Sequence, residues 1–91
     1  MNKGELVDAI AQKAGVTKKQ ADEVLSAAID TITDAVSEGD KVTLVGFGSF
    51  EKRERQAREG RNPKTGETMT IPATSVPAFS AGKSFKEKVA S

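Results

Sequence analysis

Residues 52–64 carry a run of cations with almost nothing apolar among them. Six positive side chains stand against Glu54 and Glu59, and they are Lys52, Arg53, Arg55, Arg58, Arg61 and Lys64. Four of the six are arginines, whose planar guanidinium group pairs with phosphate oxygens and enters narrow minor grooves. This pattern predicts that the segment binds a polyanion of the nucleic-acid type.

The same segment lacks the side chains it would need to pack onto a globular body. Ala57 and Pro63 are its only apolar residues between positions 52 and 68, so burial offers little against the entropy of ordering it. Residues 62–66, Asn-Pro-Lys-Thr-Gly, have strong turn chemistry. With the strand-like residues 69–71 they predict a projecting β-hairpin, whose limbs of about eight residues reach about 26 Å. The alternative is a solvated loop that pairs with its own glutamates.

The segment at residues 82–86 could bind phosphate in two ways. Gly82-Lys83-Ser84 resembles the end of a nucleotide-binding loop, but the pattern needs glycine at position 77, where Pro77 stands. We therefore expect no nucleotide hydrolysis. The amino-terminal end of the last helix, with Lys83 and Lys86 beside it, is instead predicted to hold a backbone phosphate. The alternative is that these are plain surface lysines.

Catalytic chemistry has few candidates in this chain. It contains neither cysteine nor histidine, which excludes disulfides, thiolate zinc sites and cysteine nucleophiles and removes the usual general base. We expect a protein that is not an enzyme and that has no metal site and no cofactor.

The large apolar side chains are few for 91 residues, and tryptophan and tyrosine are absent. Small domains without disulfides or metals often complete their core with a partner subunit. We therefore expect a two-fold dimer, with a marginal monomer as the alternative. Phe47, Phe50 and Phe79 are interpreted as anchors of a sheet face or subunit interface, with stacking on unpaired bases as the rival. The predicted dimer core is Phe47, Phe50, Phe79, Leu44, Ile29 and Ile32.

Two helices must come first along the chain. Asn2 and Glu5 form a capping-box pattern, and apolar residues four apart continue the helix to Gly15. Thr17 and Gln20 repeat the capping signal and predict a second helix over residues 18–38.

Strands follow, and a short helix ends the chain. We expect a strand at residues 42–45, a tight turn or bulge at 46–48, and an extended strand over 49–58. A third strand returns with Pro72 and Pro77, which restrict it to an edge or a bend. The last helix follows Gly82.

Charge is divided unevenly between the two halves. Residues 1–40 hold 4 basic and 8 acidic side chains, whereas residues 41–91 hold 10 and 5. The net charge of +1 therefore hides a basic second half, which favours a polyanionic partner there. No signal-peptide pattern and no run of about 18 apolar residues occurs, so we expect no membrane partner.

Several of these motifs together resemble the bacterial histone-like HU proteins, which with integration host factor form a family of architectural DNA-binding proteins. The matching segments cover residues 45–50 (VGFGSF), 60–66 (GRNPKTG), 76–79 (VPAF) and 82–83 (GK). The resemblance implies one α+β domain over residues 1–91 that forms an intertwined dimer. Its parts would be a helical base at 1–40, a three-stranded antiparallel β-saddle at 41–81 with a long arm at about 52–70, and a C-terminal helix at 82–91.

The resemblance also implies roles for single residues. The arms would embrace the minor groove, with Pro63 wedged between base pairs to kink the duplex. DNA contacts are implied for the following residues: Arg53, Arg55, Arg58, Arg61, Asn62, Pro63, Lys64, Lys83, Lys86, Lys3 and Lys18.

The function expected from all of this is sequence-independent binding and bending of double-stranded DNA, which compacts chromosomal DNA in the bacterial cytoplasm and nucleoid. Nicked or bent DNA should bind better, because part of the deformation is already present. Three rivals remain: a sequence-preferring relative like integration host factor, an RNA-binding or ribosome-associated basic protein, and a dimerisation module with an idle arm. A heterodimer with a paralogue and RNA as a secondary ligand also stay open.

Overall fold

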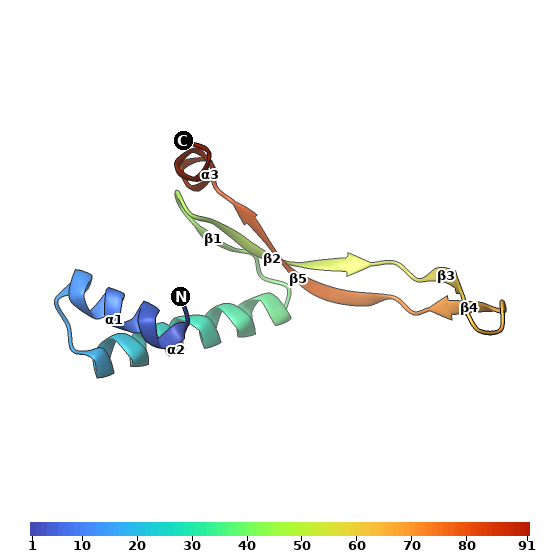
Figure 1. Ribbon diagram of the computed structural model, residues 1–91, viewed down its shortest axis with the longest axis horizontal. Helices are drawn as coiled ribbons and strands as arrows, with labels where there is room; N and C mark the ends of the chain where they lie inside the picture. The colour runs from blue at the N-terminus through green and yellow to red at the C-terminus, as the bar shows by residue number, and fades with distance from the viewer. The chain divides into compact units, whose positions relative to one another are not determined.

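The computed structural model describes residues 1–91 as three helices and five strands, in an α+β order (Figure 1). They divide into two compact units, Met1–Asp34 and Ala35–Ser91, which are described in turn. No helix is long and apolar enough to cross a membrane. The elements are α1 (Lys3–Ala14), α2 (Lys18–Ser37), β1 (Val42–Leu44), β2 (Gly48–Arg55), β3 (Arg58–Arg61), β4 (Thr68–Ile71), β5 (Thr74–Ala81) and α3 (Lys83–Ala90).

Both predicted capping boxes start helices of the first unit. The backbone N–H of Glu5 donates to Asn2 Oδ1 at 2.9 Å, and the N–H of Asn2 donates to Glu5 Oε1 at 3.4 Å. At the start of α2, the N–H of Gln20 donates to Thr17 Oγ1 at 3.1 Å, and the reciprocal bond measures 3.0 Å. Gly15 ends α1 with φ 70°, a conformation that favours glycine. The predicted helix starts are therefore confirmed.

The core of the first unit is small. Val7, Ala11 and Ala21 are buried together, and the half-buried Ile10 and Leu25 pack against them. Two of the three buried side chains are alanines, which allow α1 and α2 to approach closely but remove little apolar area from water. This unit therefore has a thin core of its own.

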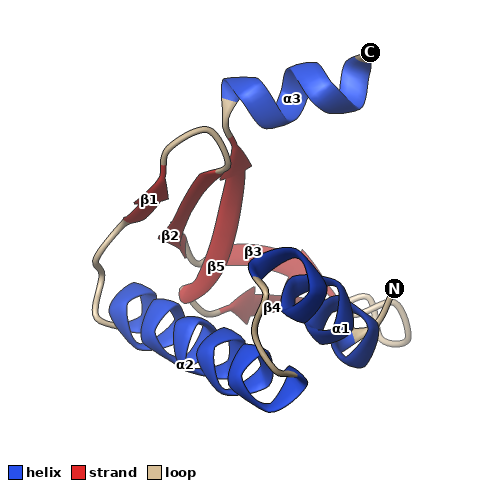
Figure 2. Ribbon diagram, turned by 90° about the vertical axis from the view of Figure 1, so that its left-hand side faces the viewer, coloured by secondary structure: helices blue, strands red, loops and turns tan.

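A three-stranded antiparallel sheet with strand order β1-β2-β5 forms the centre of the second unit (Figure 2). Phe50 of β2 lies opposite Val42 of β1 and Phe79 of β5, so the three apolar residues stand in one row across the sheet. Pro77 lies in β5, which is an edge strand of this sheet, as the prolines predicted.

The long strand predicted over residues 49–58 is interrupted. β2 ends at Arg55, and a separate two-stranded ladder, β3-β4, begins at Arg58. Arg55 is paired with Thr74 and Arg58 with Ile71, three residues further along each strand, so both ladders belong to one hairpin in one register. Between them this register puts Pro72, which has no N–H to donate, opposite Ala57. The three-stranded antiparallel sheet with its hairpin arm is therefore as predicted, but the strand expected to run without a break over 49–58 ends at Arg55, because the ladder breaks at this proline.

Candidate nucleic-acid interface

The hairpin ends in a tightly hydrogen-bonded turn at residues 62–67. The N–H of Asn62 donates to the carbonyl oxygen of Glu67 at 2.8 Å, and the N–H of Gly66 donates to that of Asn62 at 2.7 Å. Asn62 Oδ1 accepts the N–H of Lys64 at 2.9 Å, and Gly66 has φ 74°. The predicted turn is confirmed, and it leaves Pro63 exposed at the tip. Asn62 has a role the sequence did not reveal, because its side chain stabilises the turn.

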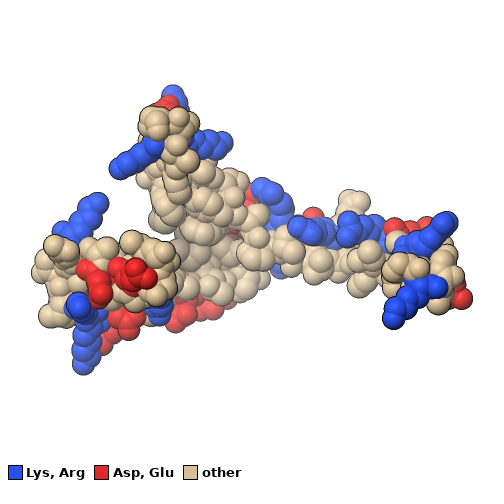
Figure 3. Space-filling model, viewed as in Figure 1, with Lys and Arg blue, Asp and Glu red and all other residues tan.

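The cations of the arm, which we define as residues 52–70, are almost all unpaired. Arg53 lies 3.3 Å from Glu51 Oε1, and Glu54 accepts a hydrogen bond from Ser75 Oγ at 2.8 Å. Figure 3 shows Lys and Arg side chains recurring along this ribbon. No ion pair forms with the remaining arm cations, which are Lys52, Arg55, Arg58, Arg61 and Lys64. The structure therefore does not support a loop neutralised by its own glutamates.

The outer ladder β3-β4 distributes side chains to two faces. Directly opposite residues share a face and successive residues alternate. The pairing therefore places one set on each side of the ribbon: Arg58, Gly60, Met69 and Ile71 on one face, and Glu59, Arg61, Thr68 and Thr70 on the other. Each face carries one arginine, so a bound polyanion meets positive charge on either side of the ribbon.

The amino-terminal end of α3 carries the predicted pair of lysines. Gly82 is its N-cap residue and supplies no side-chain hydrogen bond, so the first N–H groups of the helix are left without a side-chain cap. Lys83 and Lys86 are both exposed here. Lys83 Nζ lies 3.9 Å from Glu87 Oε1 in an exposed pair, which is weak enough to exchange for a phosphate.

The two remaining predicted lysines lie in the helical unit and are already paired. Lys3 Nζ donates to Ser26 Oγ at 2.9 Å and lies 3.7 Å from Asp22 Oδ1. Lys18 Nζ lies 3.4 Å from Asp8 Oδ1. A phosphate would have to compete with these carboxylates, although exposed pairs of this kind contribute only about 0–1 kcal/mol.

All four phenylalanines of the chain form one aromatic cluster in the second unit. Ring centroids lie 4.8 Å apart for Phe50 and Phe79, 5.3 Å for Phe47 and Phe79, and 5.2 Å for Phe47 and Phe85. Phe85 was missed as a member of this cluster, because nothing local in the sequence says which face its helix presents. The anchoring role of the other three agrees with this geometry.

The aromatic cluster is only partly covered by the chain itself. Phe47 is 45% exposed and Phe79 is 42% exposed. Of the other residues predicted for a dimer core, Leu44 and Ile29 are also exposed, whereas Phe50 and Ile32 are half-buried. In the second unit, Leu44, Phe47 and Phe79 therefore leave apolar surface open to solvent around the cluster, and in the first unit Ile29 does so by itself.

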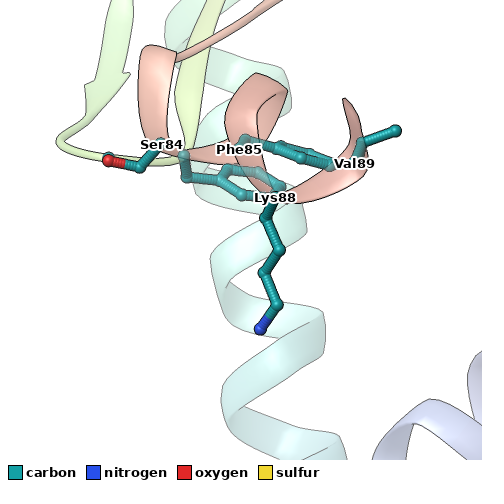
Figure 4. A pocket seen from close by; sticks show the side chains of 6 residues that line it. Ser84, Phe85, Lys88 and Val89 are labelled. Atoms are coloured by element: carbon teal, nitrogen blue, oxygen red, sulfur yellow. The ribbon is translucent and has the colours of Figure 1, made fainter. Parts of the chain in front are cut away.

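A shallow pocket of about 490 Å³ opens beside the cluster. In Figure 4, Phe85 and Val89 of α3 border it, and the amine of Lys88 extends away from the rings. Its lining is formed by Gly46, Phe47, Ser84, Phe85, Lys88 and Val89, with no acid–base pair among them. No group of three or more potential metal-binding side chains occurs in the structure. The pocket is thus an extension of the apolar surface.

A helical unit, a three-stranded sheet and a cationic hairpin arm define a small α+β protein whose exposed cations lie outside its core. Residues 1–90 match the family described as bacterial DNA-binding protein. The chain is 80% identical to the DNA-binding protein HU of Nostoc sp. over 90 residues, which is 99% of this chain and 96% of that protein. It is 68% identical to the HU of Synechocystis sp. over 96 residues, with the same two coverages.

A solved structure agrees with these sequence matches. The Anabaena HU–DNA cocrystal structure has a TM-score of 0.92 and 80% identity, and the match covers 99% of this chain and 98% of that one. The chain belongs to the HU family of bacterial DNA-binding proteins. The predictions of family and of an α+β fold are confirmed, whereas the roles assigned to single residues stay predictions.

Proposed function

We propose that this protein is an architectural DNA-binding protein, which binds and bends double-stranded DNA with little sequence preference and so compacts chromosomal DNA in the nucleoid. The observation that carries the proposal is the arm: a hairpin without a core, whose exposed cations have almost no partners within the chain. Such a ribbon gains order when a polyanion neutralises it. The Anabaena relative, with a TM-score of 0.92, was crystallised with DNA.

The low sequence preference follows from the types of side chain that the arm carries. Lysine and arginine contacts to phosphates position a protein on the duplex but carry no base code. Asn62 is the one amide in the tip, and its oxygen already accepts a hydrogen bond from Lys64. The arm therefore recognises charge and groove shape, which favours an HU-type role over that of a sequence-preferring relative.

Bending is assigned to Pro63. The turn around it is closed by four hydrogen bonds, three of which involve Asn62, so the proline ring is held at the tip. Inserting such a ring between base pairs costs a few kcal/mol of unstacking, which is offset by the additional DNA that then contacts the protein. Arg55, Arg58 and Arg61 would follow the minor groove on the way to the tip.

A second copy of the chain is the partner that we assign to the exposed apolar surface. Phe47, Phe79 and Leu44 are each more than 40% exposed in a single chain. Full burial of such a side chain from water stabilises by about 1.5–3 kcal/mol, so covering the part still exposed would contribute somewhat less than half of that for each. A homodimer would also present two arms. Each arm carries +4 over residues 52–64, so the pair would bring +8 to the duplex.

Flanking phosphates complete the proposed interface. Lys83 and Lys86, at the uncapped start of α3, would hold one phosphate by charge and by backbone N–H groups. Lys3 and Lys18 would contribute once phosphate replaces their carboxylate partners. In this account the protein acts by binding alone.

The test is a salt series on intact and nicked duplexes of one sequence. If a dimer neutralises about six to ten phosphates, affinity should fall about 10³–10⁵-fold between 50 and 200 mM salt. The nicked duplex should bind more tightly at every salt concentration, because its bend costs less. A flat salt response would contradict the proposed function.

A further inference from the structure

The carboxylates of α2 form a row that the proposed DNA interface does not use. Glu23, Asp30 and Asp34 are separated by seven and four residues, so they lie on one side of the helix. Figure 3 shows acidic side chains gathered along the lower edge of the part of the molecule that contains α2. No lysine or arginine occurs between residues 20 and 40, where six acidic residues stand. We call the three carboxylates the acidic row.

The acidic row is not explained by the stability of the helix. Asp30 and Asp34 are four residues apart, and like charges at this spacing destabilise a helix. The helix dipole adds to this cost, because Lys18 and Lys19 begin α2 at its positive end and no basic residue occupies its last turn. A cationic partner outside the helix would explain why the row has this composition.

The row is open to such a partner. The four ion pairs of the structure include neither Glu23 nor Asp30, and both side chains are exposed. Val24 lies beside them and is 70% exposed. This valine offers apolar surface that the aliphatic stem of an arginine or lysine can cover while its charged end meets a carboxylate.

The arm of a second copy has the complementary charge and length. Residues 52–64 carry a net charge of +4, whereas residues 1–40 carry −4. Arg55 and Arg61 are six residues apart in one register, which places them on the same side of the ribbon about 20 Å from each other. Glu23 and Asp34 are about 17 Å apart along α2. No ion pair joins the arm to α2 within one chain, so the contact is one between copies.

We infer that, in the absence of DNA, the acidic row of one copy binds the arm of another copy. The contact occupies the same arginines that the proposed function assigns to phosphates. Each strand of DNA carries one phosphate per about 3.4 Å of helix axis, whereas the row at its densest has one carboxylate per about 6 Å. DNA therefore displaces the row. This displacement rests on the proposed function, but the contact between copies does not.

The experiment measures self-association of the full-length protein without DNA by sedimentation velocity. At about 50 mM salt the protein should form assemblies that dissociate at about 200 mM, because salt screens contacts between exposed charges. Glu23→Gln with Asp30→Asn should weaken the association about tenfold. This variant should melt at the same temperature as the unmodified protein or slightly above it, because repulsion within α2 is removed.

Two further variants isolate the contact. Asp8→Asn with Glu87→Gln removes the same number of negative charges outside the row, and it should leave self-association unchanged. Arg55→Ala with Arg61→Ala should weaken self-association as much as the loss of the row does. A mixture of this arm variant with the row variant should associate more strongly than either alone, because each supplies the group that the other lacks.

The inference is wrong if the unmodified protein forms no salt-dependent assemblies, or if the row variant and its charge-matched control weaken them equally. A mixture that associates no better than its components would also overturn it. Nicked duplex DNA should dissociate the assemblies of the unmodified protein. Failure of the proposed function gives a different result, because DNA would then leave the assemblies intact while salt and the row variant still weaken them.

Discussion

The helical unit and the arm of this protein are held together by different means. Residues 1–34 combine two capping boxes with a small buried core around Ala21. The arm has backbone pairing and a bonded turn, but no buried side chain. The contrast shows that one region has local stability of its own, whereas the other presents exposed cations that the fold does not need.

The two regions also differ in how their cations are paired. Lys3 and Lys18 of the helical unit pair with carboxylates, whereas five of the six cations between residues 52 and 64 pair with none. Substitutions in the arm should therefore affect binding and leave folding unchanged. Substitutions at the apolar anchors should lower the stability of the fold and leave the contacts of the arm unchanged.

The strongest test removes the three central arginines of the arm, Arg55, Arg58 and Arg61, together by substitution with alanine. A dimer would lose six phosphate contacts, so the slope of log affinity against log salt should become shallower by about five. Affinity at 200 mM salt should fall at least about 10³-fold, as measured by fluorescence anisotropy. Lys13→Ala with Lys19→Ala, two exposed lysines of the first unit outside the proposed interface, is the control. A loss of affinity as large as that of the arginine variant would contradict the difference between the two regions.

The next effect concerns stability. Phe47→Ala should reduce the free energy of unfolding by about 3–5 kcal/mol, because it truncates an anchor of the proposed dimer core. Urea unfolding and sedimentation together would measure the loss of stability and of dimer. Wild-type melting in this variant would show that Phe47 is not an anchor.

The bending of bound DNA should depend on the tip of the arm alone. Pro63→Ala should keep the dimer and its melting temperature but reduce the bend angle of bound DNA, measured by energy transfer between labelled duplex ends. The preference for nicked over intact DNA should shrink with it, because less deformation is imposed. Unchanged bending would remove Pro63 from the wedge role.

The smallest expected effect comes from substituting one asparagine in the helical unit and one in the arm. Asn2→Ala removes a helix cap and should lower the free energy of unfolding by about 1 kcal/mol. Asn62→Ala removes the bond to the N–H of Lys64 and should leave thermal melting unchanged while weakening DNA binding by a few-fold. Equal changes in melting for the two variants would contradict the separation of the two regions.

Local patterns allowed much of this structure to be predicted. The capping boxes, the turn at residues 62–66 and the edge position of Pro77 depend on residues near each other in the chain, and all are confirmed. The fold class and family followed from motifs spread over the whole length.

The features that were missed depend on long-range pairing. The break opposite Pro72 requires the register of the hairpin, which is not visible in either strand alone. The common face of Met69 and Ile71 was visible in their spacing, but not their position over Gly60. Phe85 joins its cluster through contacts between α3 and the turn before β2. Sequence periodicity within an element cannot report such contacts.

The interruption at residues 56–57 and 72–73 has a mechanical consequence. Four residues there lack ladder bonds, yet the turn beyond them and β2-β5 before them fix the same alignment. Bending at this point breaks few backbone bonds, so it costs less than bending within either ladder. The outer ladder can therefore change its direction relative to β2-β5, and no strand has to slip past its neighbour when it does.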